Sequence, residues 1–116
     1  MSHKSHKRIF AKPKARARVF AALADRTRLK LVAALCTGQA RSITQLAEDS
    51  KLTRQAITKH LGVLERAGIV RSWPSGRERH FEFDPEPMRG LAEYLESVSA
   101  QSDKTLSRSK DSVQKK

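Results

Sequence analysis

The patterns between Ser42 and Phe83 constrain the fold more than any other part of the chain. Apolar residues recur there with helical spacing in two segments, which are separated by a short polar turn. Two further runs, 69–73 and 78–83, alternate in the manner of strands around a turn rich in proline, serine and glycine. The order helix, turn, helix and two-stranded antiparallel hairpin predicts a winged helix-turn-helix. In such a unit the second helix lies in the major groove of DNA, and the hairpin reaches the adjacent backbone or minor groove.

Residues suited to helix ends stand at the expected boundaries of these segments. Ser42 with Gln45 three residues later forms the pattern of a capping box. Thr53 is placed to cap the second helix, which we expect to end at Ala67-Gly68, because glycine accepts the left-handed conformation at a helix C-terminus. These signals support the helix assignments independently of the apolar spacing.

The outer face of the second helix carries polar side chains suited to nucleic acid. Arginine and glutamine can bind base edges bidentately, whereas threonine and lysine can bind phosphates. Arginines near a wing tip suit a narrow minor groove, where the negative potential is enhanced. The alternative is a merely solvated helix face. The predicted DNA-binding residues are Thr53, Arg54, Gln55, Thr58 and Lys59 in the helix, with Arg77 and Arg79 in the wing.

Two helices are expected before this unit. The first begins near Pro13 or Lys14, since proline is tolerated in a first helical turn. The second is capped by Asp25 and runs to about Thr37. Within it, Arg28 is expected to form a salt bridge to an acid, with a phosphate contact as the alternative. The predicted fold is therefore mainly α, with about five helices and a small hairpin.

A final helix is expected from Asp84-Pro85 to about Ser102, with apolar residues at spacings of three, four and three. This spacing is typical of an a/d seam, which packs either on its own domain or on a second copy of the chain. The seam residues are Met88, Leu91, Leu95 and Val98.

Charge is concentrated at the two ends of this 116-residue chain, whose formal net charge is +12. Residues 1–18 hold seven Lys and Arg without an acid, whereas residues 19–101 hold twelve against ten acids. We therefore expect a flexible basic tail over 1–12, one domain over 13–102 and a polar basic flexible tail over 103–116. Such tails either attract phosphates without sequence preference or are only solvated, disordered segments.

Three segments resemble the ArsR/SmtB family of bacterial winged-helix repressors: ADRTRLKLVAAL at 24–35, LTRQAITKHLGVLERAGIV at 52–70 and SGRERHFEFDPEP at 75–87. The resemblance covers roughly residues 16–100 and is greatest for the metal-independent branch with the SdpR-type autorepressors. It implies a homodimer that binds an imperfect inverted repeat and represses transcription. It also favours the second copy as the partner of the seam, with Phe20 and Leu23 of the first helix contributing.

Metal sites and catalysis are not expected. Metal-sensing members of the family use paired cysteines on the first helix of the helix-turn-helix, or Asp, His and Glu sets on the last helix. The corresponding stretches, ITQLAEDS and MRGLAEYLESVSAQ, contain neither cysteine nor histidine. Cys36 stands alone on an apolar helix and is predicted to be a buried structural thiol, and His60 is expected to pack or to bind a phosphate. There is no glycine-rich phosphate loop and no arrangement of nucleophile and base, so no cofactor is expected.

The leading hypothesis is a sequence-specific transcriptional regulator of double-stranded DNA, acting as a homodimeric repressor on an inverted-repeat operator. A cytoplasmic location is expected, because no apolar run spans a membrane and no secretory signal is visible. One alternative is an architectural or RNA-binding basic protein with little sequence specificity. Another is a protein-interaction module, for which the acidic wing residues Glu78 and Glu82 are candidates. The operator, the regulated genes and any inducer stay open.

Overall fold

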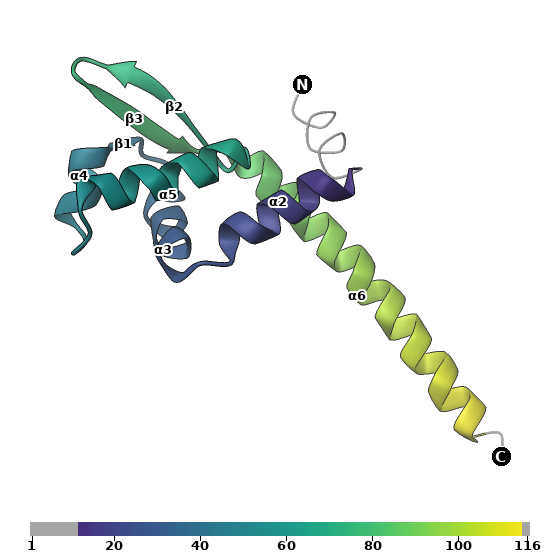
Figure 1. Ribbon diagram of the computed structural model, residues 1–116. Coiled ribbons are helices and arrows are strands. Elements are labelled where there is room, and N and C mark those ends of the chain that lie inside the picture. Colours follow the sequence, from purple (N-terminus) through teal and green to yellow (C-terminus); the bar gives the residue numbers. More distant parts are fainter. Residues whose placement is uncertain (1–11, 115–116) are drawn as a thin grey trace.

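The computed structural model describes residues 12–114, and the side chains of residues 12–107. The elements follow the order α2 (Pro13–Leu23), α3 (Arg26–Leu35), β1 (Arg41–Ser42), α4 (Ile43–Glu48), α5 (Arg54–Arg66), β2 (Val70–Ser75), β3 (Glu78–Phe83) and α6 (Pro85–Gln114), as Figure 1 shows. This is a winged helix-turn-helix in which α4 and α5 form the helix-turn-helix and β2 and β3 form the wing. The predicted fold class, mainly α with a small β-hairpin, is confirmed.

The sheet contains three antiparallel strands in the order β1-β3-β2. Arg41 pairs with Phe81 and Ser42 pairs with His80, so the two residues of β1 cover the free edge of β3. The predicted two-stranded wing is confirmed in β2 and β3, and β1 adds a third strand to its sheet. The extra strand ties the segment before α4 to the wing.

The hairpin loop consists only of Gly76 and Arg77, because Ser75 pairs with Glu78. Gly76 has a φ of +63°, which suits the first central position of a tight two-residue hairpin loop. Strand β2 therefore continues past the expected end at Trp73 and includes Pro74. Proline is tolerated there because β2 is an edge strand of the sheet.

The predicted caps are confirmed. The carboxylate of Asp25 accepts a hydrogen bond from the backbone N–H of Arg28 at 3.0 Å, and the Thr53 hydroxyl accepts one from the N–H of Ala56 at 3.1 Å. Ser42 and Gln45 form a reciprocal capping box, with distances of 3.1 and 2.9 Å. Helix α2 begins at Pro13, as expected.

The core is formed where α5 packs against the other helices and the sheet. The largest fully buried side chains include Ile57, Leu61 and Leu64 of α5, with Leu35 of α3 and Ile69 before β2. Leu91 of α6 belongs to the same core and is only 7% exposed. Its own domain therefore buries most of Leu91, and its predicted contact with a second copy stays a prediction.

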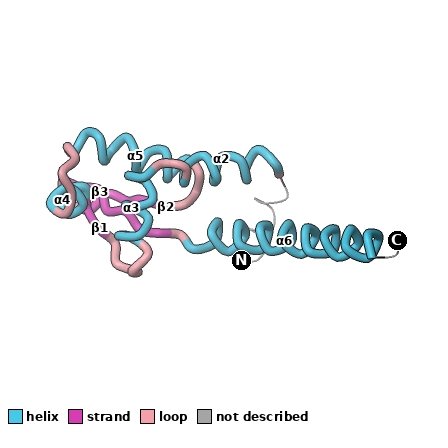
Figure 2. Tube along the Cα trace, turned by 90° about the horizontal axis from the view of Figure 1, so that it is seen from below, coloured by secondary structure: helices cyan, strands magenta, loops and turns pink. Residues whose placement is uncertain are grey.

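Helix α6 has 30 residues and continues to Gln114, well beyond the expected end at Ser102. Residues 103–114, predicted as a flexible tail, therefore belong to a helix. Figures 1 and 2 show its C-terminal part extending away from the rest of the domain. At 1.5 Å per residue the helix is about 45 Å long. The predicted tail over 1–12 lies almost entirely outside the described residues.

Cys36 is exposed at the C-terminal end of α3, so its predicted burial is wrong. The helix ends at Leu35, one residue earlier, and the thiol donates a hydrogen bond to the carbonyl of Ala33 at 3.2 Å. Within residues 12–114, none of the helices combines the length and the apolar character that a membrane crossing requires.

Candidate nucleic-acid interface

The five predicted DNA-binding residues of the helix-turn-helix lie together at the N-terminal end of α5, four within the helix and one at its cap. All of them are exposed, and with Ala56 they line a shallow hollow of about 580 Å³. These residues are Thr53, Arg54, Gln55, Thr58 and Lys59. Because Ile57, Leu61 and Leu64 fix the opposite face of α5 in the core, the exposed side chains extend from a rigid element.

The two threonines of this surface differ in what their hydroxyl groups can do. Thr58 donates its hydroxyl to the carbonyl of Arg54 at 2.7 Å, so that hydrogen is already used within the helix. The hydroxyl oxygen of Thr53 accepts the capping bond from Ala56, and its hydrogen remains available to a phosphate oxygen. Thr53 is therefore the better phosphate donor in this conformation.

The predicted wing arginines also differ. Arg77 stands in the hairpin loop and is exposed, and its side chain forms no hydrogen bond or ion pair with the described side chains of residues 12–107. The guanidinium of Arg79 donates to the hydroxyl of Ser72 at 3.2 and 3.0 Å, and Ser72 in turn donates to Glu65 of α5 at 2.6 Å. Arg79 is thus held across the hairpin, whereas Arg77 is free to reach a ligand.

Glu78 joins the wing to the helix-turn-helix. It is the first residue of β3, and its Oε1 accepts a hydrogen bond from the hydroxyl of Thr44 in α4. The same oxygen lies 3.9 Å from Nη2 of Arg54, the first residue of α5. The side chain at the start of β3 therefore reaches both α4 and the N-terminal end of α5. No sequence pattern predicts this contact, because the residues stand far apart in the chain.

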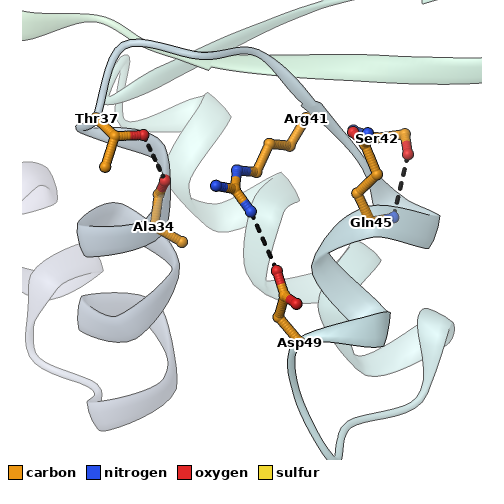
Figure 3. A network of polar contacts seen from close by, with 6 residues as sticks. All are labelled: Ala34, Thr37, Arg41, Ser42, Gln45 and Asp49. Carbon is orange, nitrogen blue, oxygen red and sulfur yellow. Dashed lines mark hydrogen bonds and ion pairs between the residues drawn. The ribbon is translucent and has the colours of Figure 1, made fainter.

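Helix α4 is fixed at both ends, as Figure 3 shows. The capping box of Ser42 and Gln45 holds its N-terminus. At its C-terminus, Asp49 forms an ion pair with Arg41 of β1 at 3.1 Å. Because β1 pairs with β3, these contacts position α4 relative to the wing.

Arg28 connects α3 to α2 and α5. Its Nε donates to the carbonyl of Ala22 at 2.6 Å and its Nη2 to that of Ala21 at 3.4 Å, while Nη1 lies 3.2 Å from Nδ1 of His60. The expected salt bridge to an acid is therefore replaced by bonds to two backbone carbonyls. Nearby, the backbone N–H of Arg28 lowers the pKa of Asp25 by stabilising its carboxylate.

The residues predicted to contact a second copy are divided between the core and the surface. Leu91 is buried, and Leu23 and Met88 pack partly against the core. Phe20, Leu95 and Val98 remain 39%, 49% and 45% exposed. The Phe20 and Tyr94 rings are nearly perpendicular, with 6.2 Å between their centroids, so α2 and α6 contact each other beside these exposed side chains.

The residue chemistry of the described part does not form a metal site. Over residues 12–114, no three His, Cys, Asp or Glu residues are grouped closely enough to hold a metal ion. His60 lies near Asp25, with 3.9 Å between Nδ1 and Oδ2, but the Arg28 guanidinium lies 3.2 Å from the same His60 nitrogen.

Comparisons with known proteins agree with this geometry. Residues 23–72 match a family model described as a helix-turn-helix domain. The chain is 38% identical over 79 residues to the HTH-type transcriptional regulator YuzN of Bacillus subtilis, covering 63% of this chain and 86% of that protein. It is 36% identical over 74 residues to the HTH-type transcriptional regulator Rv2034 of Mycobacterium tuberculosis, covering 64% and 68% respectively.

A solved structure extends the similarity to the fold. The ArsR-like transcriptional regulator from Rhodococcus sp. RHA1 superposes with a TM-score of 0.82 and 34% identity, covering 89% of this chain and 94% of that one. Regulators of this kind are a non-enzymatic class, and the exposed α5 surface is suited to DNA. The chain therefore belongs to the ArsR family of helix-turn-helix transcriptional regulators.

Proposed function

We propose that this DNA-binding regulator is a homodimeric repressor that acts in the cytoplasm on an inverted-repeat operator. The observation that carries the proposal is the position of the wing beside α5. Glu78 at the start of β3 contacts Thr44 of α4 and lies 3.9 Å from Arg54 of α5, which connects the wing to the helix-turn-helix in one surface. A surface of this kind can contact a major groove and its flanking backbone together.

Within this surface, base reading and backbone attraction are assigned to different residues. Arg54 and Gln55 begin α5, where side chains meet base edges in a major groove. Thr53 and Lys59 are suited to phosphates, and Arg77 extends from the wing toward the backbone or the minor groove. Thr58 would need to change rotamer before it could donate to DNA.

The exposed apolar surface of α2 and α6 supports the homodimer. Phe20, Leu95 and Val98 lie on it, and Leu106 further along α6 is 61% exposed. A second copy related by a two-fold axis would cover these side chains and remove apolar area from water. Two reading surfaces related in this way require a near-palindromic operator, with half-sites about 34–36 Å apart.

We further propose that DNA binding is independent of transition metals, as in the SdpR-type branch of the family. Zinc prefers sets of three or four Cys, His or carboxylate ligands. The α4 and α6 stretches that hold metal in the metal-sensing members lack Cys and His here. Any inducer would therefore be of another chemical class.

Zinc should leave operator binding nearly unchanged. The measurement is a zinc titration of the full chain carrying His3→Gln and His6→Gln. These substitutions remove the two N-terminal histidines, which lie outside the described residues and could bind zinc by themselves. The operator Kd should change less than about twofold, because a site with fewer than three ligands holds zinc weakly. A tenfold or greater loss at one zinc per subunit would contradict the metal-independent assignment.

Gln55→Ala and Arg77→Ala should weaken DNA binding in different ways. Gln55→Ala should cost about 1–3 kcal/mol on the operator and little on random DNA, as the loss of a base contact does. Arg77→Ala should weaken both DNAs more evenly and reduce the salt slope by roughly one. Both variants are measured on both DNAs at three or more salt concentrations. If Gln55→Ala weakened binding to operator and random DNA equally, sequence reading by Gln55 would be refuted. If Arg77→Ala left both affinities unchanged, a wing contact with DNA would be refuted.

The central test is selection of bound duplexes from a random DNA library at near-physiological salt. A regulator of the proposed kind enriches an inverted repeat. An architectural or RNA-binding protein would show a steep salt dependence without enrichment, and a protein-interaction module would retain no DNA. Binding to the enriched site should then require two subunits per duplex.

A further inference from the structure

We propose that Glu78 is a specificity-determining residue, which positions Arg54 and weakens binding to non-cognate DNA. The inference rests on the proposed function, in which Arg54 and Gln55 read the operator. Glu78 itself is not assigned a base contact. Its role follows from a negative charge held within a surface that must otherwise attract phosphates.

The geometry connects three elements through a single oxygen. Oε1 of Glu78, at the start of β3, accepts the hydroxyl of Thr44 in α4 and lies 3.9 Å from Nη2 of Arg54 in α5. The Thr44 bond fixes the carboxylate, because the sheet and α4 are both held to the core. The Arg54 side chain is 64% exposed and the Glu78 side chain 38%, so both face the surface that meets DNA.

This arrangement affects the two kinds of DNA differently. An exposed ion pair is weak because water and salt screen it, so a correctly placed guanine, which offers a bidentate contact, can draw Arg54 away. A phosphate on random DNA offers a weaker replacement and also approaches the Glu78 charge. Glu78 therefore lowers affinity most where Arg54 gains no base contact, and specificity increases because binding to the wrong partner is opposed.

Glu82 provides a matched control on the same strand. Its Oε1 accepts two hydrogen bonds from Arg71, at 2.9 Å from Nε and 2.6 Å from Nη2, so it too is a carboxylate paired with an arginine. Arg71 lies at the base of the hairpin rather than in α5. Glu78→Gln and Glu82→Gln change the net charge equally, but only the first alters the partner of Arg54. Glutamine at position 78 retains an oxygen that can accept from Thr44, so the connection to α4 is preserved.

The experiment compares wild type, Glu78→Gln and Glu82→Gln on the selected operator and on a random duplex, at three salt concentrations. Glu78→Gln should raise affinity for random DNA about tenfold and change operator affinity less than threefold, so that discrimination falls several-fold. Glu82→Gln should shift both DNAs by one common factor. On an Arg54→Ala background, Glu78→Gln should cause no further loss of discrimination, since the positioned side chain is absent.

Three outcomes would overturn the inference. Equal behaviour of Glu78→Gln and Glu82→Gln would reduce the effect to net charge. Equal weakening on both DNAs by Glu78→Gln, with a lower melting temperature, would reduce Glu78 to a structural role. If Glu78→Gln caused the same several-fold loss of discrimination on the Arg54→Ala background, the effect of Glu78 would not depend on Arg54. A wild type without sequence preference would instead refute the proposed function itself, and would be evident before any variant is compared.

Discussion

Leu95→Glu should convert the proposed homodimer into monomers and remove most operator binding. Leu95 is 49% exposed on α6, in the apolar surface that the second copy would cover. Placing an unpaired carboxylate in a buried interface costs about 3 kcal/mol or more, which corresponds to at least a hundredfold weaker association. Light scattering should report about twice the 13.0 kDa chain mass for the wild type and approach that mass for the variant.

Leu29→Glu is the matched control for this change. Leu29 is a comparably exposed leucine, at 51%, but lies on α3 outside the proposed interface. Leu29→Glu should leave the dimer and the operator affinity intact. Comparing Leu95→Glu with Leu29→Glu therefore separates a local effect at α6 from a general effect of added negative charge. A wild type that is monomeric at micromolar concentration would contradict the proposed assembly.

Arg28→Ala should lower the free energy of unfolding by about 2–3 kcal/mol. The guanidinium of Arg28 donates to the carbonyls of Ala21 and Ala22, and the substitution removes these charged donors at the C-terminal end of α2. It also removes the contact with His60 of α5. The measurement is urea denaturation, with the midpoint and slope compared between the variant and wild type.

Arg26→Ala provides the comparison for Arg28→Ala. Arg26 is exposed at the start of the same helix, so its loss removes a positive charge of the same kind. Its effect should remain within about 0.5 kcal/mol, as is usual for surface substitutions. If Arg28→Ala were no more destabilising than Arg26→Ala, the bonds to α2 would contribute nothing measurable to stability.

The helix caps and the buried face of α5 could be predicted from the sequence because both depend on residues close together in the chain. Asp25, Ser42 and Thr53 each receive a backbone hydrogen bond from the residue three positions later. Ile57 and Leu61 are four residues apart and necessarily share one face of a helix. The exposed side chains of α5, including Gln55, then follow by exclusion.

The apolar spacing of α6 predicted a seam, but it could not tell which seam residues pack on the chain's own domain and which remain for a second copy. Leu91 and Leu95 are four residues apart and have the same chemistry. The domain's own core nevertheless buries Leu91, whereas Leu95 remains about half exposed. The difference depends on where the core ends along α6, which is set by the position of α5 and the sheet. The helix also continues through residues 103–114, where no apolar periodicity indicated it.

Local sequence thus determined the order of elements, their caps and the face of α5 that contacts DNA in the proposal. Tertiary structure decided the contacts between elements distant in the chain. Two residues, Arg41 and Ser42, become a strand only because β3 presents a free edge. Glu78 reaches Thr44 and Arg54 only because the hairpin folds back beside α4 and α5. Such contacts require the chain to close long loops, and their geometry is set by the packed core rather than by the spacing of neighbouring residues.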